Sequence, residues 1–341
     1  MSDAVSGDRA RHVQFPPDPA SLRRHFGLLV GESPAMRRVY TEIARVAPTD
    51  AAVLVVGESG TGKDLVAQVI HAGSKRAAGP YLPINCGAMS PSLIESELFG
   101  HERGSFTGAL LRHQGHFERT SGGTLFLDEV TEIPLELQAR LLRVVESGTL
   151  LRVGGEIALQ TDVRVIASTN RPPQTAMRDG KLRRDLYYRL SVFPIQLPPL
   201  RQRPGDIDLL ARHFLDELNA VHGSDKRLPP EVVGAFERYD WPGNVRQLKN
   251  TLQRAFILAG EGHDIQYFPR PDTTAAALPH APTIVGKSLE ELNREMILAT
   301  LAHYGSRRKT AAALGISLKT LYNRLNLYKR DASSSDHGSE D

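Results

Sequence analysis

Residues 53–66, VLVVGESGTGKDLV, decide the fold. Val53–Val56 form a short apolar run of the kind found in buried strands, and a helical pattern follows the loop. Glycines here let the backbone turn its N–H groups inward, and the N-terminus of a helix attracts anions. The glycine and lysine spacing from Gly57 to Lys63 is that of a P-loop, which binds phosphate. A chance glycine-rich turn is the alternative, and the flanking strand and helix argue against it.

Lys63 is expected to reach the β- and γ-phosphates of a nucleotide. Asp64 stands where P-loops usually carry a Ser or Thr that ligates magnesium. A magnesium ion would therefore depend more on a second acidic motif and on water. The loop residues predicted to bind the nucleotide are Gly57, Glu58, Ser59, Gly60, Thr61, Gly62, Lys63 and Asp64.

A second apolar run, TLFLD at residues 124–128, ends in two adjacent carboxylates, Asp128 and Glu129. Ligands of α/β sheets bind at the carboxyl ends of the strands, so this pair is expected to face the P-loop. Asp128 is predicted to hold the hydration shell of Mg²⁺, and Glu129 to polarise the attacking water as general base or orienter. A solvated acidic turn is the alternative, and the P-loop upstream argues against it.

Apolar runs alternate with helix-like segments through the first part of the chain. One intervening helix is expected to start at Ser90, a capping residue followed by Pro91. Alternation of this kind is typical of an α/β fold, a parallel sheet with helices on both faces. Strands are predicted at 51–56, 81–85, 124–128, 163–168 and 192–197.

Composition divides the rest of the chain. Strand signals stop at Pro204, and a small helical subdomain is predicted from there. A Pro-, Thr- and Ala-rich stretch then favours a linker. The expected parts are a disordered N-terminal arm (1–26), an α/β subdomain (27–199), a helical subdomain (200–260), a linker (261–286), an all-α module (287–330) and a disordered tail (331–341).

The 341-residue chain has 24% charged and 40% hydrophobic residues, as globular proteins do. No stretch approaches about 18 consecutive apolar residues, so no membrane span or membrane partner is expected. The single cysteine, Cys86, has no internal disulfide partner, which suits a reducing cytoplasm. The net charge of +3 permits nucleic-acid binding without demanding it, so the location of the charge matters more.

Basic residues gather near the C-terminus. Residues 304–330 include seven Lys and Arg and no Asp or Glu. The sequence RRKTAAALGISLKTLYNRL predicts a helix, a tight turn at 314–316, a cap at Ser317 and a second helix. This is the pattern of a helix-turn-helix, whose second helix enters the major groove of DNA. A helical hairpin that only mediates dimerisation is the alternative.

The second helix is expected to turn its leucines inward and its polar residues toward DNA. The leucines are Leu318, Leu321 and Leu325. The residues predicted to contact DNA are Arg307, Lys309, Ser317, Lys319, Thr320, Asn323 and Arg324.

Taken in order, the motifs resemble the AAA+ ATPase domain of bacterial enhancer-binding proteins, the activators of sigma-54 RNA polymerase. The matching segments are GESGTGK, ESELFGHERGSFTGA, GGTLFLDEV, LQARLLRVVESGTLLRVGG, RVIASTN, LRRDLYYRL and WPGNVRQLKN. The resemblance covers residues 28–260 and resumes at 287–328, which are similar to the Fis-type DNA-binding domain of that family. It implies a P-loop sheet with a helical lid, the cofactors ATP and Mg²⁺, and remodelling of sigma-54 RNA polymerase from enhancer DNA. An acidic residue after the P-loop lysine is common in the family.

The resemblance also assigns roles within the nucleotide site. Asn85 is similar to the switch that holds Glu129 until the γ-phosphate is sensed. Asn170 resembles the sensor that touches the γ-phosphate or the lytic water. Arg246 resembles a second sensor, which couples the helical lid to the nucleotide state.

Two further arginines, Arg183 and Arg189, resemble fingers supplied in trans to the ATP of a neighbouring subunit. A guanidinium suits this task because it stabilises charge that spreads over the transferred phosphoryl group. Arg184 lies between them, and the sequence leaves open which of the three reaches. Fingers in trans imply a ring oligomer, by resemblance a hexamer. Surface salt bridges are the alternative for each arginine.

The segment GSFTGA at 104–109 resembles the loop with which the family grips the sigma factor. Glycines permit a hinge, and the Phe-Thr pair supplies an apolar and a hydroxyl contact. Ser105 stands where the family usually has Ala. Segment 144–155 resembles a second, supporting loop. The residues predicted to contact sigma-54 are Gly104, Ser105, Phe106, Thr107, Gly108 and Ala109.

Two other functions fit part of the pattern. An AAA+ DNA-binding regulator that does not act through sigma-54 would lack the Phe-Thr loop. A protein remodeller such as a protease-associated unfoldase would not need the basic helix-turn-helix.

The arm at 1–26 is too short and polar to fold as a sensor, so the ATPase is expected to lack an N-terminal regulatory domain and to be competent by default. Control would then come from expression level, from a paralogous co-activator in a mixed ring, or from a regulatory protein acting in trans.

Overall fold

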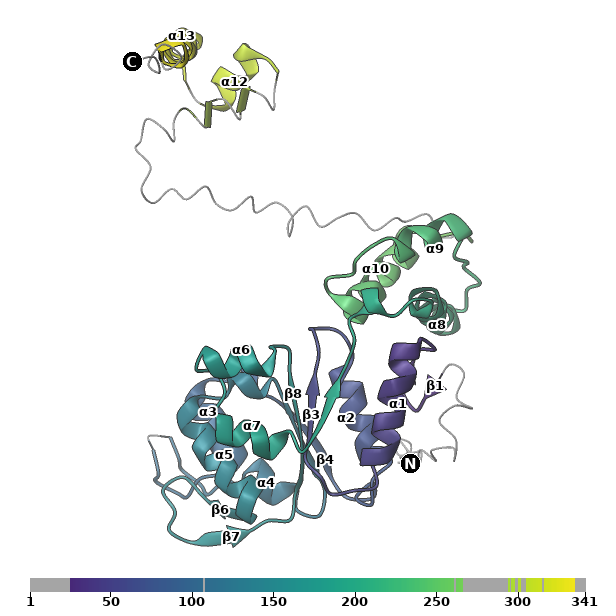
Figure 1. The fold of residues 1–341 in the computed structure, drawn as a ribbon, viewed down its shortest axis with the longest axis vertical. Helices are drawn as coiled ribbons and strands as arrows, with labels where there is room; N and C mark the ends of the chain where they lie inside the picture. Colours follow the sequence, from purple (N-terminus) through teal and green to yellow (C-terminus); the bar gives the residue numbers. More distant parts are fainter. Residues whose placement is uncertain are drawn as a thin grey trace, which may run out of the picture. The chain divides into compact units, whose positions relative to one another are not determined.

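The chain divides into two compact units, residues 1–269 and 270–341. Figure 1 shows the helices and strands of each unit, from purple at the N-terminus to yellow at the C-terminus. The computed structural model describes residues 25–106, 108–260, 262–265, 294, 296–297, 300–301, 305–314 and 316–334.

A five-stranded parallel sheet forms the centre of the first unit, in the order β4-β5-β8-β3-β9. Both this sheet and its strands confirm the sequence prediction. The bounds of β4 and β5 agree with it. The start of β3 differs by two residues, and β8 and β9 each differ by one residue at both ends. The strands are Val53–Val56 (β3), Tyr81–Asn85 (β4), Thr124–Asp128 (β5), Arg164–Thr169 (β8) and Phe193–Gln196 (β9).

Side chains of β3 alternate between two hydrophobic cores, one on each face of the sheet. Leu54 and Val56 pack with α3 (Pro91–Phe99), α5 (Leu135–Ser147) and α7 (Arg184–Leu190). Val53 and Val55 pack with α1 (Pro34–Val46) and α2 (Lys63–Ala72). The two groups of helices lie on opposite sides of the sheet in Figure 1. As predicted, α3 starts with Pro91 and has Ser90 as its N-cap residue.

Short elements complete the α/β part. The sequence analysis did not predict the two antiparallel hairpins, β1-β2 and β6-β7. The short elements are β1 (His25–Phe26), β2 (Leu29–Val30), η2 (Cys86–Ala88), α4 (His116–Arg119), η3 (Val130–Glu132), β6 (Thr149–Leu151), β7 (Ala158–Gln160), α6 (Pro173–Arg178) and η4 (Leu200–Gln202).

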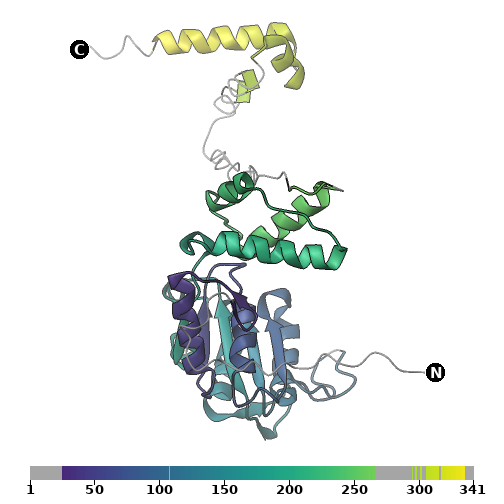
Figure 2. The same ribbon diagram turned by 90° about the vertical axis from the view of Figure 1, so that its right-hand side faces the viewer.

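Among the described residues, three helices form the lid, which lies as a separate layer at one end of the α/β part in Figure 2. They are α8 (Asp206–His222), α9 (Pro230–Glu237) and α10 (Asn244–Leu258). Trp241 is fully buried in their core, and its Nε1–H donates to the Phe236 carbonyl at 2.8 Å. No helix in the described part of the chain is long and apolar enough to cross a membrane.

Two predicted boundaries are wrong in the first unit. Phe26 is buried and stacks on Tyr40 with ring centroids 5.0 Å apart, so the predicted disordered arm ends before it. Ile265 is buried in the lid core, and its N–H donates to the Arg227 carbonyl at 3.0 Å. The predicted linker therefore starts later than 261. Residues 1–24 and 266–286 lie outside the described part.

In the second unit, α12 (Arg307–Ala313) and α13 (Leu318–Ser334) confirm the predicted helix pair. The Ser317 Oγ accepts the Thr320 N–H at 3.1 Å, as a cap does. Leu321 is buried, whereas Leu318 is 43% exposed. The prediction for Leu318 is wrong because the buried stripe runs through positions 321, 325 and 328.

The end predicted for α13 is also wrong. The helix continues to Ser334, since no Gly or Pro interrupts residues 318–334. The predicted tail at 331–341 is therefore helical in its first residues. Its remainder, 335–341, lies outside the described part of the chain.

Candidate functional site

The P-loop joins the end of β3 to the start of α2. Gly60 and Gly62 have φ of 77° and 98°, a left-handed conformation that favours glycine. Lys63 is buried at the first position of α2, and its Nζ donates to the Gly57 carbonyl at 3.0 Å. The same Nζ lies 3.3 Å from Glu129 Oε1. The predicted phosphate ligand and the predicted general base are therefore direct neighbours.

Asp128 ends β5, and Glu129 follows it with a φ of 58°. A positive φ is costly for a residue with a side chain and tends to occur at functional sites. Ser168 on β8 holds both residues, because its Oγ donates to Asp128 Oδ1 at 2.5 Å and accepts the Glu129 N–H at 3.2 Å. Glu129 Oε2 also accepts the backbone N–H of Asn170 at 2.9 Å. Together these contacts fix both carboxylates at the carboxyl edge of the sheet.

Asn85 ends β4 and makes a different contact from the one predicted. Its Nδ2 lies 3.4 Å from Asp128 Oδ2, not at Glu129, because Asn85 and Asp128 are paired in register across neighbouring strands. The adjacent thiol of Cys86 has its pKa raised to about 12 by burial. It therefore stays protonated and offers no nucleophile.

These groups border a pocket of about 510 Å³, within the usual range for small-molecule sites. The lid closes one side of it through α8 and α10. Arg246 of α10 lines the pocket, and its Nη1 donates to Ser59 Oγ at 3.3 Å. The lining residues are Ser59, Gly60, Gly62, Lys63, Asp64, Leu65, Asn85, Asp128, Glu129, Asn170, Phe214, Val245, Arg246 and Lys249.

Some residues predicted to bind the nucleotide do not line the pocket, and some residues that line it were not predicted. Gly57, Glu58 and Thr61 belong to the loop without lining the pocket. Sequence reasoning missed Leu65, Phe214, Val245, Lys249 and the orienting Ser168. Lys249 carried a usable signal, since it follows Arg246 by three residues on one helix and so shares its face. The apolar residues carried none beyond ordinary helical periodicity.

Arg183, Arg184 and Arg189 do not line this pocket in the described part of the chain. Arg183 pairs with Asp185 at 2.7 Å, and this hydrogen-bonded carboxylate raises the pKa of Arg183. Arg189 donates to the Val145 carbonyl at 3.2 Å, at the C-terminal end of α5. All three arginines are exposed, and Arg183 and Arg184 line a shallow surface hollow with Tyr188.

The segment 104–109 folds into a compact turn. Gly104 N–H donates to the Ala109 carbonyl at 2.8 Å, and Ala109 N–H donates to the Phe106 carbonyl at 3.0 Å. Its two flanking glycines have φ of 81° and 107°. Phe106 is 47% exposed with its ring edge-on to His101, whereas Ala109 is buried. Thr107 lies outside the described residues.

The β6-β7 hairpin supports this turn. Glu102 N–H donates to the Val153 carbonyl at 3.0 Å. The buried Arg152 donates to Glu102 Oε1 at 2.6 Å and to Glu118 Oε2 at 2.5 Å, so one guanidinium joins three segments. Both contacts fall within segment 144–155, which the sequence predicted to be a supporting loop.

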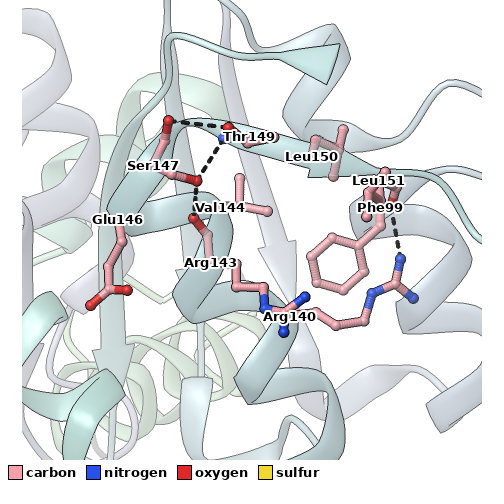
Figure 3. A pocket seen from close by; sticks show the side chains of 9 residues that line it. All are labelled: Phe99, Arg140, Arg143, Val144, Glu146, Ser147, Thr149, Leu150 and Leu151. Atoms are coloured by element: carbon pink, nitrogen blue, oxygen red, sulfur yellow. Dashed lines mark hydrogen bonds between the residues drawn. The ribbon is translucent and has the colours of Figure 1, made fainter. Parts of the chain in front are cut away.

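A second hollow, of about 370 Å³, lies where α3, α5 and β6 meet (Figure 3). Arg140 lies over the Phe99 ring, 4.6 Å from its centroid, and donates to the Leu151 carbonyl at 2.8 Å. Ser147 Oγ accepts the Thr149 N–H at 3.2 Å, which ties the end of α5 to the hairpin. No P-loop residue lines this hollow, and its contacts fasten the hairpin to the α/β part.

The second unit presents an exposed polar face on its helix pair. Arg324 is half-buried, and the remaining predicted DNA contacts are exposed. Arg307 is anchored, since it donates to the Tyr322 hydroxyl at 3.0 Å and lies over that ring. The exposed residues are Arg307, Lys309, Ser317, Lys319, Thr320 and Asn323.

Comparison with known families matches the whole of this arrangement. Residues 29–196 match the sigma-54 interaction domain, 201–279 the AAA+ ATPase lid domain, and 288–328 the bacterial regulatory protein, Fis family. The chain is 44% identical over 315 residues to the transcriptional regulatory protein ZraR of Escherichia coli, covering 90% of this chain and 70% of ZraR. The chain belongs to the sigma-54-dependent transcriptional activators.

This activator is similar to two further proteins of the family. It is 49% identical over 254 residues to the transcriptional regulator NtrC of Azospirillum brasilense, covering 74% of the activator and 53% of NtrC. The crystal structure of NtrX from Brucella abortus in complex with ATP superposes with a TM-score of 0.68 at 34% identity, covering 90% of the activator and 70% of NtrX. The activator is thus an AAA+ ATPase with a Fis-type helix-turn-helix, as the sequence predicted.

Proposed function

We propose that the activator binds enhancer DNA and assembles into a hexameric ring, in which ATP hydrolysis remodels the closed complex of sigma-54 RNA polymerase at a promoter. Because DNA and RNA polymerase are cytoplasmic in bacteria, we propose that the activator acts in the cytoplasm. The observation that carries the proposal is the pocket formed by the P-loop, the strand ends and the lid, with Lys63, Glu129 and Arg246 all on its wall.

Hydrolysis requires a water activated near the γ-phosphate. Glu129 is the base for this step, and Lys63 holds the β- and γ-phosphates. The contact of Glu129 Oε1 with Lys63 Nζ at 3.3 Å supports a base that is held until the phosphates draw the lysine away. Asn170, whose N–H contacts the other Glu129 oxygen, is placed to sense the same event.

ATPases of this class use ATP together with Mg²⁺, a cation that takes oxygen ligands and keeps several bound waters. The residues present fit it, because Asp64 and Asp128 both line the pocket and Ser168 orients the Asp128 carboxylate. When bound, Mg²⁺ would neutralise charge on the phosphates.

Ring assembly is supported by the arginines of the α7 region. Arg183 is exposed and lies off the pocket of its own chain, so it is available to the ATP of a neighbour. Arg189 is held nearby through the carbonyls at the end of α5. In such a ring, each active site would be completed by the next subunit.

The turn at 104–109 is the proposed contact with sigma-54. Phe106 is an exposed aromatic side chain on a short turn between positive-φ glycines, and few groups of its own chain cover it. The hairpin and Arg152 connect this turn to α4 and α5, so a movement of the sheet edge can reach it.

The proposal is tested by transcription from a sigma-54 promoter in a purified system. Protein, sigma-54 RNA polymerase and supercoiled template carrying the enhancer are mixed with ATP and Mg²⁺. Open complexes are expected with ATP and absent with a non-hydrolysable analogue. Equal open-complex formation with both nucleotides, or activity on a promoter read by another sigma factor, would contradict it.

A further inference from the structure

Glu58 lies inside the P-loop, yet its carboxylate does not face the nucleotide pocket. Arg201 clamps it from the segment that leads to the lid, with Nη1 donating to Oε2 at 2.8 Å and Nη2 to Oε1 at 2.6 Å. Asn244 Nδ2 donates to the same Oε2 at 3.2 Å. The hydrogen bond from Arg201 lowers the pKa of Glu58, so the carboxylate stays charged. Both of its oxygens therefore accept hydrogen bonds from η4, which leads to the lid, or from the start of α10 in the lid.

Asn244 is the first residue of α10 and is fully buried. Its φ of 51° is left-handed, a conformation that Asn tolerates better than most residues. Besides Glu58, its Nδ2 donates to the Ser59 carbonyl at 3.0 Å, and its Oδ1 accepts the Leu200 N–H at 2.8 Å. One amide thus satisfies the P-loop on one side and the lid connection on the other.

Backbone contacts follow the same path. The Arg246 N–H donates to the Gly60 carbonyl at 3.2 Å. A Cβ at Gly60 would lie 2.4 Å from the Gly243 carbonyl oxygen, so only glycine allows this approach. The outer surface of the P-loop is therefore packed directly on the start of α10, the helix that carries Arg246 into the pocket.

We propose that Glu58 is a positioning residue that fastens the P-loop to the lid through Arg201 and Asn244, and that it does not bind ATP. Residues 58–60 and 243–246 then move as one piece. Because Arg246 lines the nucleotide pocket, any shift of the P-loop on nucleotide binding carries Arg246 and the rest of α10 with it. The inference rests on ATP binding in this pocket, and it names the part of the chain that reports occupancy to the lid.

Three variants test the link. Glu58→Gln replaces the carboxylate with a neutral amide, and Arg201→Gln removes the guanidinium that donates to both of its oxygens. Asn244→Gly keeps the left-handed φ while deleting the side-chain amide. Each is expected to raise the KM for ATP by roughly 3- to 10-fold, the range that corresponds to the net contribution of a typical hydrogen bond. Glu58→Gln combined with Arg201→Gln should be no worse than either alone, since both break one contact. Arg212→Gln is the matched control, because it removes the lid's Arg212–Asp208 pair without touching the P-loop.

A second measurement does not depend on ATP turnover. Amide hydrogen exchange of residues 241–248 in the nucleotide-free protein should be faster in all three variants and unchanged in the control. Trp241, the only tryptophan, reports the same region by fluorescence, and its response to added ADP should shrink in the variants. If the wild-type protein showed no ATPase activity, the proposed function would be contradicted. The exchange measurement would still test the link between the P-loop and the lid.

Two outcomes would overturn the proposal. In the first, Glu58→Gln raises KM while Arg201→Gln leaves both KM and exchange at wild-type values, which would make Glu58 a ligand of ATP. In the second, the effects of Glu58→Gln and Arg201→Gln add fully in the double variant, which would separate the two residues.

Discussion

Glu129 combines an unfavourable backbone conformation with three contacts that hold it there. Its φ of 58° is maintained by Ser168 on the N–H, while Lys63 and Asn170 hold the two carboxylate oxygens. Strain of this kind persists only where neighbouring structure fixes it, and here it aims the carboxylate at the phosphate site.

Replacing Glu129 by Gln keeps this shape and removes the base. We expect Glu129→Gln to bind ATP with near wild-type affinity and to turn it over roughly 100-fold more slowly or worse. Nucleotide binding by fluorescence and phosphate release by the purified variant measure the two properties. Turnover near the wild-type rate would remove Glu129 from the role of base.

The sequence identified side chains whose role follows from a local pattern. Asp128 and Glu129 stand at a strand end and Lys63 at the start of a helix, each in a recognisable motif, and the structure brings them together. Ser168 was missed because only tertiary packing brings it to the site, whereas Lys249 shares a helix face with Arg246 and could have been found from that spacing. The contact of Asn85 with Asp128 was not predicted for a related reason, since strand register selects that neighbour.

Strands, like side chains, could be predicted where a local sequence pattern determines them and were missed where long-range contacts do. The bounds of β4 and β5 were predicted because each is a short apolar run in a buried sheet. The β6-β7 hairpin was missed because the residues of its strands are mostly polar or exposed. Long-range contacts hold it, such as those of Arg140 with the Leu151 carbonyl and of Arg152 with Glu102. The hairpin packs against the turn at 104–109, so we expect the hairpin and the turn to move together.

Because the turn at 104–109 lies apart from the nucleotide pocket, we expect ATP turnover and open-complex formation to be separable by mutation. Phe106→Ala should leave ATP turnover near wild type and abolish open-complex formation, because Phe106 is 47% exposed and does not line the nucleotide pocket. Val221→Ala, which trims an exposed apolar residue of the lid, is the control and should preserve both activities. ATPase and transcription assays on the same preparations give the answer. Parallel loss of turnover and activation in Phe106→Ala would place the turn within the catalytic machinery.

Helix α13 carries the proposed DNA contact. Arg324→Ala should weaken binding to the cognate enhancer, by about 1–3 kcal/mol in discrimination at one base if Arg324 reads that base. A phosphate contact would instead weaken all sequences alike and reduce the salt dependence. Titrations of specific and scrambled duplexes at several salt concentrations separate the two, with Arg212→Ala in the lid as control. Unchanged binding to every duplex would take Arg324 out of the interface.

Considered whole, the activator has one pocket proposed to bind ATP, and Arg183, Arg184 and Arg189 do not line it. The residues proposed to hold phosphates and to activate water line one pocket, and Arg246 of the lid lines it as well. Among the described residues, Arg183 pairs with Asp185, two residues away in sequence, and its side chain is exposed. A cation so placed contributes little to folding stability, since exposed ion pairs are weak. This placement is consistent with the role proposed for Arg183 in the site of another subunit.

Mixing two inactive variants tests this arrangement. Arg183→Ala should lower ATP turnover roughly a thousandfold or more while leaving nucleotide binding intact, as the loss of an arginine finger does. Glu129→Gln is inactive for a different reason. In a mixed ring, a site with Glu129 from the Arg183→Ala subunit and Arg183 from its Glu129→Gln neighbour is complete, so the mixture should regain turnover that neither variant has alone. Arg178→Ala, which removes another exposed arginine paired with its sequence neighbour Asp179, should be fully active by itself. If labelled subunits exchange and the mixture still stays inactive, Arg183 does not act in trans.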